Sequence, residues 1–78
     1  MSISRRDAIK RLEGLAAVVE EHMLKIANHA DHPSAMHWRH EIESWIEQME
    51  AVLPVAGKKT EATWRARILR WHETLGGE

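Results

Sequence analysis

The chain is 78 residues long, with a hydrophobic fraction of 44%, a charged fraction of 29% and a formal net charge of −1. A chain of this size is expected to form one domain with a small core, and its composition gives no reason to expect disorder. The absence of cysteine excludes a disulfide framework, a thiol nucleophile and a thiolate metal site. No apolar run is long enough to span a bilayer, and the small net charge does not favour a membrane surface or nucleic acid.

The first predicted helix covers residues 4–30. Ser4 and Asp7 have the spacing of a capping box, and apolar residues then recur at intervals of three and four, as on one face of an amphipathic helix. The segment "SRRDAIKRLEGLAAVV" also resembles the start of a twin-arginine export signal. Because Glu13 interrupts its apolar stretch, we interpret it as the beginning of a helix and expect a cytoplasmic protein.

Two further helices follow, each after a predicted turn. Pro33 marks the first turn, and the apolar stripe that follows it predicts a helix over residues 34–53. Pro54 and Gly57 favour a second break, after which a stripe with the same spacing predicts a helix over residues 60–75.

The sequence therefore predicts an all-α fold, a three-helix bundle with a long first helix and an antiparallel helical hairpin, as one domain over residues 1–78. At a rise of 1.5 Å per residue the first helix would measure roughly 40 Å, the second roughly 30 Å and the third roughly 24 Å. A first helix that extends past its partners leaves apolar side chains for another chain to cover. We expect a homo-oligomer or a larger protein partner, with Leu12, Leu15, Val19 and Met23 as the contacts.

Four of the six histidines lie in the segment "NHADHPSAMHWRHE". His29 and His32 are candidate ligands for zinc or nickel, because both lie near the end of the first helix. The zincin signature is absent, since Ser44 stands where its second histidine is needed, and no glutamate has the di-iron spacing. A metal site and a contact sensitive to pH near 6.5 remain alternatives. We favour an ordinary turn and expect no metal or cofactor.

The basic third helix suggests a second kind of partner. Arg65, Arg67 and Arg70 are candidates for contacts with nucleic-acid phosphates or for ion pairs. The tryptophans fall on apolar stripes, which predicts a place in the core. The sequence shows no nucleophile with an obvious base, no paired carboxylates on an apolar face and no glycine-rich phosphate loop. We therefore expect neither an enzyme nor a small-molecule substrate.

Two segments carry a family resemblance, "RLEGLAAVVEEHMLKI" and, after the proline turn, "HWRHEIESWIEQMEAVL". Together they resemble the latter half of a bacterial all-helical family, the domain of unknown function twenty-nine. A His-Leu-Leu-Lys-Trp-like motif of that family corresponds to His22, Met23, Leu24, Lys25 and Ile26, and apolar positions of its next helix correspond to Trp38, Ile42, Met49 and Leu53. The resemblance implies an all-helical fold and a bacterial or phage-like source, without an established activity.

The sequence thus predicts a small helical protein-interaction module that associates with itself through the first helix. A small nucleic-acid-associated regulator that uses the basic third helix is the alternative. A histidine-based metal-binding protein is less favoured.

Overall fold

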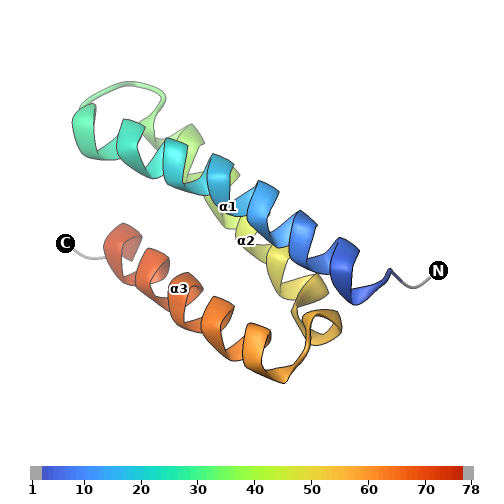
Figure 1. Cartoon of the computed structure of the whole chain (residues 1–78). Coiled ribbons are helices and arrows are strands. Elements are labelled where there is room, and N and C mark those ends of the chain that lie inside the picture. Colours follow the sequence, from blue (N-terminus) through green and yellow to red (C-terminus); the bar gives the residue numbers. More distant parts are fainter. Residues whose placement is uncertain (1–2, 77–78) are drawn as a thin grey trace.

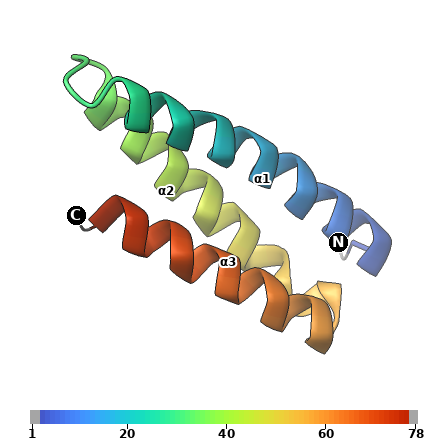
Figure 2. The same cartoon turned by 60° about the vertical axis from the view of Figure 1, so that its left-hand side comes forward.

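The computed structural model describes residues 3–76 and shows an all-α fold (Figure 1). Helix α1 spans Arg5–Asn28, α2 spans Ala35–Val52 and α3 spans Lys58–Gly76, and a short 3₁₀ helix, η1, spans Leu53–Ala56. Helices α1 and α2 form an antiparallel hairpin, and α3 runs beside it in the direction of α1 (Figures 1 and 2). The predicted three-helix bundle is confirmed. Within residues 3–76, no helix has the length and apolarity needed to cross a membrane.

The first two helices begin differently. At the start of α1, the Asp7 backbone N–H donates to the Ser4 hydroxyl oxygen at 3.1 Å, which satisfies one of the free N–H groups of the first turn. Ser34 precedes α2, but its side chain makes no capping hydrogen bond. Its backbone N–H instead donates to His32 Nδ1 at 3.0 Å, so that histidine helps to order the turn.

Helix α3 begins at Lys58, earlier than the sequence predicts. Pro54 lies at the start of η1, where a missing N–H costs little. Gly57 then adopts φ 95° and ψ 151°, a conformation open essentially to glycine alone. This one residue reverses the chain so that α3 can return along the hairpin.

The core draws side chains from all three α-helices and from η1. Its buried members are Ala8, Leu12, Ala16, Val19, Ile42, Ile46, Met49, Leu53, Ala56, Trp64, Ile68 and Trp71. The apolar residues of α1 that recur at intervals of three and four form a seam along the helix. Because η1 continues α2 and packs on α1, the chain itself covers the first half of this seam. In this half of α1, the expectation that another chain covers the seam is therefore wrong. The loop end of the α1–α2 hairpin extends beyond the end of α3 (Figures 1 and 2).

Gly57 and Gly14 provide a matched test of the turn. We expect Gly57→Ala to lower the free energy of unfolding by about 1–3 kcal/mol, because alanine is strained at this backbone conformation. Gly14 lies inside α1, and a Cβ there would meet nothing within 4 Å. Gly14→Ala should therefore raise the free energy of unfolding by about 0.5–1 kcal/mol. Urea denaturation followed by circular dichroism measures both changes, and a neutral Gly57→Ala would contradict the assigned turn.

Candidate protein-interaction surface

Helix α3 contacts the hairpin through large side chains. Trp64, Ile68 and Trp71 form its buried stripe. The Arg39 guanidinium of α2 also donates a hydrogen bond to the Leu75 carbonyl oxygen near the end of α3. The α3 backbone packs closely on η1, whereas farther along the helix these long side chains bridge the space to α1 and α2. The spaces on either side of this stripe form grooves.

The first groove lies between the second halves of α1 and α3 and has a volume of about 410 Å³. Its walls are mostly apolar, and its lining residues are Glu20, Met23, Leu24, Ala27, Trp71 and Thr74. Leu24 is 64% exposed, although it is a large aliphatic side chain. The groove and Leu24 together form an exposed apolar surface, and surfaces of this kind are candidates for contact with another protein. We refer to these six residues as the α1–α3 groove.

An ion pair crosses from α3 to α1 beside this groove. Arg67 donates to the Glu20 carboxylate at 2.7 Å. The same guanidinium lies 4.4 Å from the centroid of the Trp64 ring and 5.3 Å from that of Trp71. Arg67 therefore covers both indoles and neutralises the carboxylate of the groove. A partner that covers the α1–α3 groove would meet no unpaired charge at Glu20.

The four residues predicted as partner contacts divide between core and groove. Leu12 and Val19 are 0% exposed and belong to the core. Leu15 and Met23 are partly buried against that core, and of the four only Met23 lines the α1–α3 groove. A substitution such as Val19→Asp would therefore report on folding and not on association.

The groove also has apolar members that were not predicted as partner contacts, and they are Leu24, Ala27 and Trp71. Leu24 and Ala27 lie off the regular three–four seam of α1, so periodicity assigns them to the solvent side. Trp71 was predicted to lie in the core, where the structure places it, but its ring also forms a wall of the groove. Single leucines are common on protein surfaces, so Leu24 gave no signal for the groove in the sequence alone.

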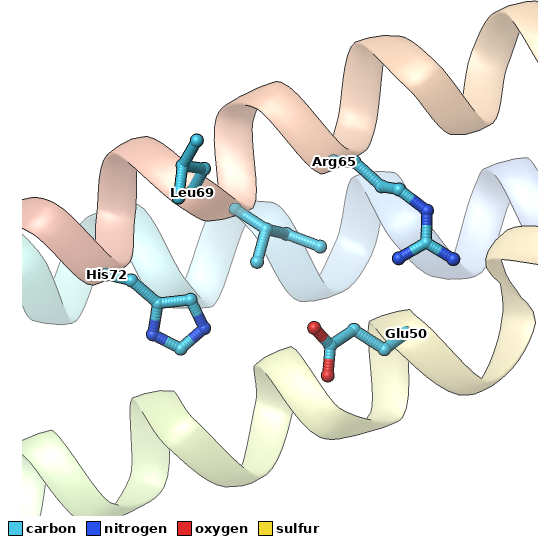
Figure 3. Close-up of a pocket in the computed structure, with 5 residues that line it drawn as sticks. Glu50, Arg65, Leu69 and His72 are labelled. Carbon is cyan, nitrogen blue, oxygen red and sulfur yellow. The ribbon is translucent and has the colours of Figure 1, made fainter.

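A second, smaller groove lies on the other side of α3, facing α2. It has a volume of about 170 Å³ and is lined by Glu50, Arg65, Ile68, Leu69 and His72. Figure 3 shows the Glu50 carboxylate pointing from α2 toward α3, with the side chains of His72 and Arg65 on either side of it. Leu69 is 60% exposed at its edge, nearly the same exposure as Leu24. This groove is smaller and more polar than the α1–α3 groove, which makes it the weaker candidate.

The three predicted arginines do not form one surface. Arg65 donates twice to Glu61 of its own helix, at 2.9 and 2.7 Å. Arg67 is paired with Glu20 of α1. Among the ion pairs within residues 3–76, none includes Arg70. Two of the three predicted nucleic-acid contacts are thus neutralised within the chain, one by α3 itself and one by α1.

The two histidines proposed as metal ligands lie at the α1–α2 turn. His29 follows the last residue of α1, and the ring of His32 stacks on Trp38 with a centroid distance of 5.0 Å. Two other histidines, His22 and His37, approach the same Glu41 oxygen, at 3.7 and 3.5 Å. In the part of the chain that the structure describes, no group of three or more histidine or carboxylate side chains could hold a metal ion.

No protein-family model, no curated protein and no solved structure matches this chain. The resemblance to the domain of unknown function twenty-nine therefore brings no function to the proposals below. The bacterial source and the cytoplasmic location stay predictions.

Arg67 and Arg65 offer a matched test of how α3 is held. Both are arginines of α3 paired with a glutamate, but only Arg67 reaches another helix and covers the indoles. We expect Arg67→Ala to lower the free energy of unfolding by about 1 kcal/mol through lost packing and cation–π contact. Arg65→Ala should cost only about 0.3–0.5 kcal/mol, because it breaks an exposed pair within one helix. Urea denaturation of both variants measures the difference, and equal losses would contradict the role given to Arg67.

Proposed function

We propose that this chain is a small helical protein-interaction module that associates with a second copy of itself through the α1–α3 groove. The observation that carries the proposal is the exposed Leu24 beside an apolar recess formed by Met23, Ala27 and Trp71. The proposed role is one of binding and not of catalysis.

A second copy suits this groove because the surface contains both parts of a self-complementary contact. Leu24 offers an apolar side chain, and the recess beside it offers a place for one. In a two-fold symmetric dimer the same patch faces itself, so each Leu24 would enter the groove of the other copy. The contact would bury the exposed leucine of both chains at once.

The electrostatics of the groove also suit a self-contact. Two identical charged patches repel one another when they face across a two-fold axis. Glu20 is the acidic residue of the groove, and Arg67 already neutralises it. Closure would therefore bring together apolar surfaces and internally paired charges, without a cost from an unpaired buried ion.

Light scattering coupled to size-exclusion chromatography tests the proposal. The chain mass is 9.0 kDa, so the dimer should elute with a mass of about 18 kDa at high concentration. Leu24→Asp should weaken association by about a hundredfold or more and give the monomer, because a carboxylate would enter an apolar contact. Circular dichroism should show unchanged helix content, since Leu24 is exposed in the monomer.

Leu69→Asp is the matched control, because it changes an equally exposed leucine on the opposite side of α3. It should leave the dimer intact. A wild-type mass of 9.0 kDa at every concentration would overturn the proposal. Equal dissociation by both variants would show that the α1–α3 groove is not the interface.

A further inference from the structure

Positive charge gathers at the end of the bundle opposite the hairpin loop. Because α1 and α3 run in the same direction, their first turns lie at this common end, on either side of η1 (Figures 1 and 2). Residues 5–11 contain four cations and one carboxylate, and α3 opens with Lys58 and Lys59. Segments that are far apart in the sequence thus bring like charges to one site.

A cleft separates these two groups of cations. Its volume is about 360 Å³, and its lining residues are Arg5, Ala56, Gly57, Lys58, Lys59 and Thr60. Arg5 reaches across from α1, since its guanidinium carbon lies only 3.1 Å from where a Cβ on Gly57 would be. The glycine leaves room for this guanidinium at the start of α3. We refer to the six residues as the cationic cleft.

The part of the chain that the structure describes does not neutralise the cations of this cleft. Within residues 3–76, no ion pair includes Arg5, Lys58 or Lys59. The first turns of α1 and α3 each contain one carboxylate, Asp7 and Glu61. Arg65 already pairs with Glu61, so Asp7 is the one of the two that could offset the charge of the cleft. Three like charges around one concave site repel one another, and an anion bound between them would remove that repulsion.

We propose that the cationic cleft binds phosphates of the nucleic-acid backbone. Arg5, Lys58 and Lys59 would surround one phosphate. The row of charge continues outside the cleft with the exposed Arg6 and Lys10, which stand one helical turn apart. A ligand with phosphates in series therefore uses more of this surface than a single free phosphate does.

The cationic cleft is better suited to the backbone of a duplex than to the unpaired bases of a single strand. Binding of unpaired bases without sequence preference uses exposed aromatic side chains as stacking platforms. Trp64 is the tryptophan nearest to the start of α3 in the sequence, and it is buried in the core. The surface instead presents flexible cations, which suit phosphate contacts without sequence readout. This inference is independent of self-association through the α1–α3 groove.

Fluorescence anisotropy with a short fluorescein-labelled DNA duplex, in about 50 mM salt, tests the inference. The test variant is Lys58→Gln/Lys59→Gln, and the control is Lys25→Gln/Arg70→Gln, which removes the same charge from the second halves of α1 and α3. We expect the test variant to bind roughly tenfold more weakly and to reduce the slope of log affinity against log salt by about 2. The control should change affinity by less than about twofold.

The same measurement defines what would overturn the inference. Equal losses from the two variants would show attraction to overall charge and no site. The absence of DNA binding by the wild-type chain at low salt would exclude nucleic acid, and displacement of the labelled duplex by equimolar tripolyphosphate would show a site for a small phosphate instead. Should the lysine variant lose helix content by circular dichroism, Arg5→Gln/Arg6→Gln removes the same charge from α1 and is expected to give the same loss of binding.

Discussion

The indole side chains of Trp64 and Trp71 determine the spacing at which α3 packs against the α1–α2 hairpin. They fill the space between α3 and the other helices, and Arg67 covers them from the α1 side while it holds Glu20. A layer of such large rings keeps helix backbones farther apart than small side chains would. The grooves on both sides of α3 follow from this spacing, and so does the opening beside Leu24.

The direction of the helices places the two surfaces at opposite ends of the molecule. A helical hairpin followed by the turn at Gly57 makes α3 parallel to α1. Both helices therefore begin at the η1 end, where their first-turn cations meet, and their second halves form the apolar groove near the end of α3. The positive ends of the two helix dipoles also point to the η1 end and add to the potential there.

Periodicity predicted the three helices and most of the core, because the apolar face of a helix repeats every three to four residues whatever packs on it. It did not predict which part of that face stays open. Leu12 and Val19 are covered by the chain, while Leu24, one step off the seam, is exposed. That outcome depends on the length and position of α3, which no local pattern in α1 encodes.

For a related reason, the sequence did not predict which charged side chains are available to bind an anion. Arg65 and Arg67 looked available in the sequence, yet one is neutralised within its helix and the other across helices. Three cations around the cleft have no ion-pair partner among residues 3–76, and they are Arg5, Lys58 and Lys59. They come from segments more than fifty residues apart. Ion pairing depends on positions in space, so a count of arginines along one helix cannot locate the surface that attracts an anion.

Self-association through the first helix and nucleic-acid binding through the third began as competing predictions. The fold separates them, since the α1–α3 groove and the cationic cleft have no lining residue in common. Closing the groove around a second copy would leave Arg5, Lys58 and Lys59 uncovered in each chain. If both clefts of a two-fold dimer reach the same duplex, the second contact forms at a high effective concentration. A weak site in one chain would in this way gain affinity from the dimer without any new contact.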